Sequence, residues 1–87
     1  MKLAYANAKL NTHKIVRYGS RFAVAYYYKP PYDGGRWECG SVGTGYGSGR
    51  SAQEAVMAAS WDGGIRPDPL FRSVAAAYKY ASTAEGN

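Results

Sequence analysis

Residues 43–61 read GTGYGSGRSAQEAVMAASW, a glycine-rich segment that leads directly into a helical pattern. The Ser51 hydroxyl can accept a hydrogen bond from the amide of Glu54, and the Glu54 carboxylate can accept one from the amide of Ser51. This capping box predicts a helix that starts at Ser51 and that Gly63 and Gly64 end. One face of the helix is small and apolar, so it can lie close to a sheet: Ala52, Ala55, Val56 and Ala59.

The residues before this segment have the alternating pattern of β-strands. We expect strands at 14–18, 21–28 and 36–42. A two-residue turn at 19–20 joins the first pair, and a tip rich in proline and glycine at 29–35 joins the second pair.

The second of these strands has one large and one small face. Its large face is expected to meet the helix that starts at Ser51, and it consists of Phe22, Val24, Tyr26 and Tyr28. On the third strand, alternation places Trp37 and Cys39 on one face and Arg36 and Glu38 on the other.

The two ends of the chain are expected to be helical. Residues 1–11 fit a helix or a short strand, and their alanines favour the helix. Asp68 is a good N-cap and Pro69 suits a first helical position, which predicts a second helix over 69–81. The expected fold class is α+β, a single domain over residues 1–87. It has a three-stranded antiparallel sheet packed by helices, in the order α-β-β-β-α-α.

Composition and charge limit the classes of function. The 87 residues carry a formal charge of +5 and the pI is about 9.5, which favours an anionic partner, either nucleic acid or an acidic protein face. One cysteine excludes an internal disulfide and suits a reducing compartment. The sequence contains no apolar run long enough for a membrane span and no signal-peptide pattern. We therefore expect a cytoplasmic protein of the host cell that does not contact a membrane.

Catalytic and metal-ligating sets are not evident in the sequence. His13 is the only histidine and Cys39 the only cysteine, and the six acidic residues are scattered. A phosphate-binding loop would need glycine at Thr44 and lysine at Arg50. Cys39 alternates with Trp37 and is expected in the core rather than in a nucleophilic pair with His13. We expect no catalytic residue, no metal site, no cofactor and no enzymatic activity.

Aromatic and basic residues gather around the predicted hairpin tip, and a domain this small cannot bury all of its rings. The predicted partner-binding face consists of Tyr27, Lys29, Tyr32, Arg36 and Arg50. Two alternatives remain open, namely that the tyrosines only pack against helices, and that the face lies around Arg72, Lys79 and Tyr80 on the C-terminal helix. The glycine segment either holds one phosphate or carboxylate beside Arg50 or only allows the chain to leave the sheet.

Two resemblances follow from these patterns. The predicted order of helix, three strands and helix, with Gly-Ser-Gly-Arg-Ser before an alanine-rich helix, resembles a double-stranded RNA-binding domain over residues 1–61. That family grips phosphates with lysines at the start of its last helix, where this chain has Arg50. In style, the chain also resembles small phage and mobile-element proteins, among them anti-CRISPR proteins, which share compactness and few catalytic residues.

The functional hypothesis is a small non-enzymatic inhibitor of this anti-CRISPR-like kind. It would dock on a host protein or ribonucleoprotein complex through an aromatic and basic face. The alternative is a protein that binds nucleic acid directly, with the architecture of a double-stranded RNA-binding domain.

Overall fold

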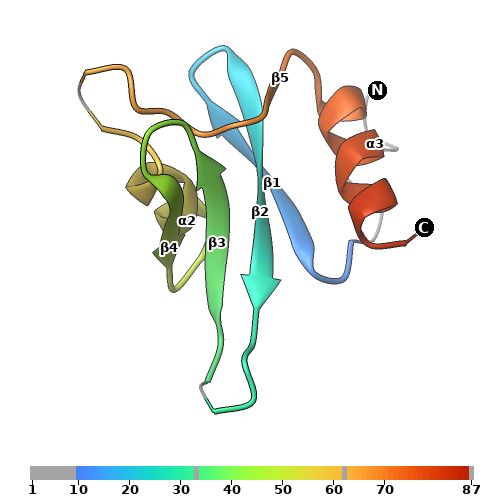
Figure 1. Cartoon of the computed structure of the whole chain (residues 1–87). Coiled ribbons are helices and arrows are strands. Elements are labelled where there is room, and N and C mark those ends of the chain that lie inside the picture. Colours follow the sequence, from blue (N-terminus) through green and yellow to red (C-terminus); the bar gives the residue numbers. More distant parts are fainter. Residues whose placement is uncertain (1–9, 33, 62, 87) are drawn as a thin grey trace.

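The computed structural model describes residues 10–32, 34–61 and 63–86 of the chain. Its elements follow the order β-β-β-β-α-β-α (Figure 1): β1 His13–Tyr18, β2 Arg21–Tyr28, β3 Arg36–Ser41, β4 Gly45–Gly49, α2 Ala52–Ala58, β5 Leu70–Phe71 and α3 Val74–Ala84. The α+β class and the antiparallel sheet are confirmed, but within the described residues the sheet has five strands instead of three. Of the expected N-terminal helix or strand, residues 1–9 lie outside the described residues, and residues 10 and 11 belong to neither.

The first four strands form an antiparallel meander in the order β1-β2-β3-β4. The predicted turn at 19–20 is confirmed, since Tyr18 pairs with Arg21 and Gly19 has a φ of 60°. Strand β2 covers the predicted residues 21–28, while β3 ends one residue earlier than predicted, at Ser41.

The second edge of β2 is shared by two strands. Its residues 26–28 pair with β3, whereas its residues 22 and 23 pair with β5. The segment before β5 also bonds to the end of β3, because the Asp68 amide donates to the Gly40 carbonyl at 3.0 Å and the Val42 amide donates to the Arg66 carbonyl at 2.9 Å. Residues 66–71 therefore complete the sheet.

The glycine segment forms the edge strand β4 over Gly45–Gly49, where we expected a loop. In the β3–β4 register, Gly47 and Gly49 lie opposite Cys39 and Trp37, on the face that packs against α2. A Cβ on Gly47 would collide with the backbone of Ala58 and Ala59. These glycines therefore let the helix lie directly against the strand.

The assignment of sheet faces was wrong for β2. Helix α2 packs against the small face of β2, in a core that contains Ala23, Ala25, Ala55 and Val56. The large face packs against α3 instead, where Val24 meets Ala77 and Ala81, with Phe22 and Phe71 at the margin. The physical reason is close approach: an alanine-rich helix fits against alanines and glycines, while the larger side chains fill a wider space beneath α3.

Both helices also differ from their predicted bounds. Helix α2 ends at Ala58, well before Gly63, because the chain turns at Ala59 and Trp61 then pairs with Ile65. Helix α3 begins at Val74 rather than at Pro69, since Leu70–Phe71 forms β5. Its N-cap is Ser73, whose hydroxyl accepts a hydrogen bond from the Ala76 amide at 3.1 Å.

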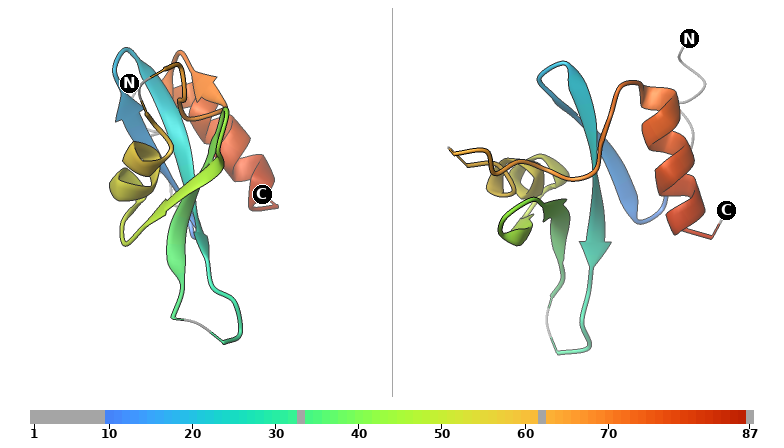
Figure 2. Two further views of the ribbon diagram at one scale, coloured as in Figure 1. Left: turned by 60° about the vertical axis from the view of Figure 1, so that its left-hand side comes forward. Right: turned by 45° about the horizontal axis from the view of Figure 1, so that its top comes forward.

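The two helices lie on opposite sides of the twisted sheet, and the β2–β3 hairpin extends beyond both of them (Figure 2). This arrangement leaves part of the sheet without a helix over it. In the described part of the chain, neither helix has the length and apolar character needed to cross a membrane.

Candidate binding surface

One face of the sheet is only partly covered. Helix α3 contacts β1, β2 and β5 but, among the described residues, neither β3 nor β4, and α2 packs on the opposite face. The strand register places six side chains on the uncovered region, which we call the open sheet face: Tyr26, Tyr28, Arg36, Glu38, Tyr46 and Ser48.

The centre of the open sheet face is a hydrogen-bonded carboxylate. Glu38 is only 8% exposed, and it accepts hydrogen bonds from the Tyr26 hydroxyl at 3.1 Å and from Nε of Arg36 at 2.8 Å. Burial, and then the hydrogen bond to Glu38, raises the pKa of Tyr26 to about 12. Tyr26 therefore stays a donor at neutral pH, and Glu38 balances the charge of Arg36.

The exposed part of this face consists of two rings and a guanidinium group. Tyr28 is 41% and Tyr46 is 51% exposed. The Arg36 guanidinium lies 5.0 Å from the centre of the Tyr28 ring, so Arg36 is held by both Tyr28 and Glu38. Because Tyr28 and Arg36 stand on strands and hold each other in place, a partner would not have to order these two side chains on binding.

The structure separates the five residues predicted as the partner-binding face. Arg36 lies on the open sheet face, but Tyr27 lies on the opposite face, where its ring contacts the Trp37 ring edge-on with centroids 5.5 Å apart. Lys29 and Tyr32 are exposed in the hairpin loop, and Arg50 is exposed between β4 and α2. The part these residues play in binding stays a prediction.

The sequence reading did not place Tyr28 and Tyr46 on the same face of the sheet as Arg36. Tyr46 alternates with Gly45 and Gly47, a period-2 signal that could have identified β4 as a strand with one glycine face. Tyr28 was assigned to a covered face because the wrong helix was placed over it.

The start of α2 follows the predicted capping box in part. The Ser51 hydroxyl accepts a hydrogen bond from the Glu54 amide at 3.2 Å, as predicted. The Glu54 carboxylate accepts from the Arg50 amide at 2.9 Å rather than from the Ser51 amide. The Arg50 amide, which a bound phosphate or carboxylate would use as a donor, thus already donates to the Glu54 side chain.

Cys39 and His13 do not meet. Cys39 is buried beside Gly47 on the α2 face, and burial raises the pKa of its thiol to about 11. His13 pairs with Tyr26 on the other face of the sheet. Within residues 10–32, 34–61 and 63–86, no three His, Cys, Asp or Glu side chains gather in a way that could hold a metal ion.

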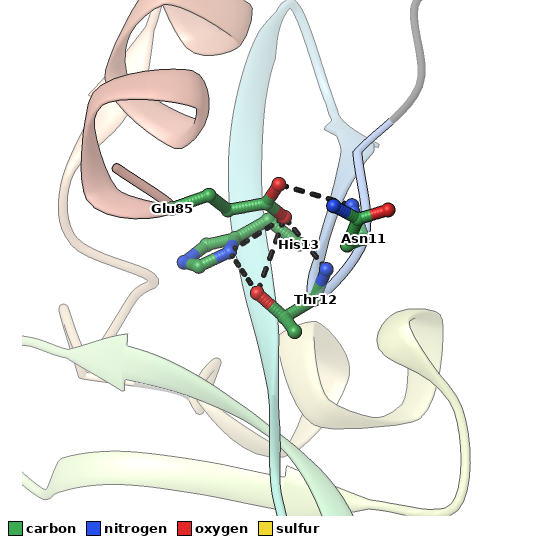
Figure 3. A network of polar contacts seen from close by, with 4 residues as sticks. All are labelled: Asn11, Thr12, His13 and Glu85. Carbon is green, nitrogen blue, oxygen red and sulfur yellow. Dashed lines mark hydrogen bonds and ion pairs between the residues drawn. The ribbon is translucent and has the colours of Figure 1, made fainter. Parts of the chain in front are cut away.

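Glu85 forms a second polar cluster (Figure 3), and the ring of its His13 lies 6.2 Å from the Tyr26 ring of the open sheet face. Its carboxylate accepts hydrogen bonds from the amides of Asn11 and Thr12 at 3.0 and 2.6 Å, and it contacts Nδ1 of His13 at 3.0 Å. Desolvation opposes ionisation of Glu85, but these hydrogen bonds outweigh it and lower its pKa to about 2. The cluster joins the end of α3 to the start of β1, which indicates a structural role.

Comparisons of the chain with protein-family models, with curated proteins and with solved structures gave no significant match.

Proposed function

We propose that this protein is a non-enzymatic binding protein that docks on a partner protein, free or within a ribonucleoprotein complex, through the open sheet face. The observation that carries the proposal is the exposed rings of Tyr28 and Tyr46, together with the half-buried Arg36, on a sheet region that no described helix covers. Tyrosine and arginine are the residue types that contribute most to binding at protein interfaces. By covering a surface that its partner needs for activity, a small protein of this kind would act as an inhibitor.

The charge distribution favours a protein partner over bare nucleic acid. Arg36 is paired with Glu38, so the open sheet face has little net charge of its own. Other cations lie over rings elsewhere in the fold: Lys14 over Trp37 on the α2 face, and Arg17 over Phe22 beside α3. A nucleic-acid site would need a continuous track of cations along the phosphates, and Lys14, Arg17 and Arg36 do not form one, because they lie on different parts of the sheet.

Neighbouring tyrosines on β2 provide a matched experiment. Tyr27 and Tyr28 are 40% and 41% exposed but point to opposite faces of the sheet. We expect Tyr28→Ala to weaken partner binding about thirtyfold, the effect of losing an interface anchor of about 2 kcal/mol. Tyr46→Ala should act in the same direction, and Tyr27→Ala should leave affinity within about twofold. The measurement is the dissociation constant of each folded variant for the protein that co-purifies with wild type after nuclease treatment.

The opposite result would place the binding site on the other face of the sheet. If Tyr27→Ala alone weakened binding, the partner would contact the face that carries Trp37 and Lys14. A direct nucleic-acid function is checked separately, by titrating wild type with single-stranded RNA and with an RNA duplex of about 16 base pairs at several salt concentrations. Tight binding with a steep salt dependence would replace the proposed protein partner.

A further inference from the structure

A groove of about 480 Å³ runs along α3, and it is lined by Phe71, Ala76, Lys79, Tyr80, Thr83 and Ala84. Its volume lies in the range of pockets that hold small ligands or single side-chain anchors, about 300–1,000 Å³. We call it the α3 groove. It uses a flank of α3 other than the Ala77 and Ala81 positions that pack on the sheet.

The lining of the α3 groove combines an aromatic pair with one cation. The Phe71 and Tyr80 rings lie 5.2 Å apart, and Tyr80 is 45% exposed although it belongs to this pair. Lys79 is the only charged residue of the lining, and it forms no ion pair with any residue that the structure describes. The groove therefore suits an apolar side chain that stands next to a carboxylate.

The α3 groove is on the side of α3 that adjoins the open sheet face. Phe71 belongs to β5, which pairs with the same edge of β2 as β3 does. The Glu85 cluster holds α3 to β1, at the other edge of β2. A partner that lies on β3 and β4 can thus reach the groove without crossing α3.

We infer that the α3 groove receives a segment of the partner protein that places an apolar side chain on Phe71 and Tyr80 and a carboxylate on Lys79. The inference rests on the proposed function, because it states the chemistry of the same partner. A second copy of this chain is a poorer occupant, because its net charge is also +5 and three of its six acidic side chains, Glu38, Glu54 and Glu85, are already hydrogen-bonded. One lysine also does not follow a phosphate backbone.

The test uses phenylacetate, an apolar ring with a carboxylate, and phenylacetamide, its uncharged counterpart. Each is titrated into ¹⁵N-labelled full-length protein while the amide resonances are recorded. We expect phenylacetate to shift resonances of α3 and Phe71, and phenylacetamide to bind about fivefold more weakly, the loss that a half-exposed ion pair gives.

Three variants in the groove and one control outside it test the lining. Lys79→Gln should remove the difference between the two probes, while Lys79→Arg should keep it. Lys29→Gln removes the same charge from the hairpin loop, outside the groove lining, and should leave the binding of both probes unchanged. Ala76 is exposed, so Ala76→Leu should fold and abolish the shifts by filling the groove.

The inference is overturned if phenylacetate leaves α3 unshifted, or if both probes bind equally to wild type. It is also overturned if oligo(dT) shifts the groove resonances at lower concentration than phenylacetate does, since this result would assign the groove to nucleic acid. The probes bind without the partner, so their failure is distinct from failure of the proposed function, which Tyr28→Ala and Tyr46→Ala report. If neither probe bound but Tyr28→Ala still weakened partner binding, the groove inference would be wrong and the open sheet face would remain the docking site.

Discussion

Gly47→Ala is expected to lower the free energy of unfolding by about 3 kcal/mol or more, the upper end of the range for overpacking. The added Cβ would collide with the backbone of Ala55, Ala58 and Ala59, so no side-chain rotation can relieve the contact. The helix would have to move away from β4, and this would loosen the core between α2 and the sheet. Because a domain of this size is stable by only about 5–10 kcal/mol, the loss is a large fraction of its stability.

Gly34→Ala is the matched control. A Cβ on Gly34 would meet nothing within 4 Å, so we expect a change within about 0.5 kcal/mol. Both variants are compared with wild type by urea denaturation followed by far-ultraviolet circular dichroism. Equal midpoints for wild type and Gly47→Ala would mean that α2 does not lie directly on β4.

Glu85→Gln is expected to cost about 1–3 kcal/mol at neutral pH, because a neutral amide cannot accept the charge-assisted hydrogen bonds of this carboxylate. The cluster is well shielded, since the Glu85 side chain is 3% exposed. Its loss would release the end of α3 from Asn11 and Thr12 and weaken the packing of α3 on the sheet.

The same group predicts a pH dependence. The pKa of Glu85 is about 2 in the folded protein against an ordinary value of 4.5, so the unfolded chain binds a proton before the folded protein does. The stabilisation is therefore present above pH 4.5 and is lost as the pH falls toward 2. Urea denaturation across this range should show wild type approaching Glu85→Gln.

Asp68→Asn is the control for the loss of a surface carboxylate, because Asp68 is exposed and its backbone bonds to β3. At neutral pH this variant should change the free energy of unfolding by no more than about 0.5 kcal/mol. A constant difference between wild type and Glu85→Gln would contradict the role of the Glu85 carboxylate.

Much of the sheet could be predicted because its signals are local. Alternation and turn residues predicted β2 and most of β3. The cap at Ser51 could be predicted because its hydroxyl bonds to the amide of Glu54, only three residues away. Strand β4 was missed because glycine has low strand propensity, and only contact with α2 explains its glycines. Strand β5 was missed because two residues become a strand only through pairing with Phe22 and Ala23, far away in the sequence.

The candidate surface was harder to predict than the fold. Arg36 was identified from its residue type and its place beside the hairpin, and its position opposite Tyr28 follows from the register. Which tyrosines stay accessible depends on which helix covers which face, and the sequence pattern of β2 fits either arrangement. Tyr28 and Tyr46 therefore became candidates only when α2 and α3 had been placed.

The shared edge of β2 also has a consequence for biosynthesis. The chain leaves the ribosome from its N-terminus, so β1 and β2 emerge before residues 66–71 can reach them. Until then the edge of β2 at Phe22 and Ala23 has no partner strand, and an open edge is a template for pairing with another chain. Closure of the sheet by residues 66–71 therefore competes with pairing between two incomplete chains.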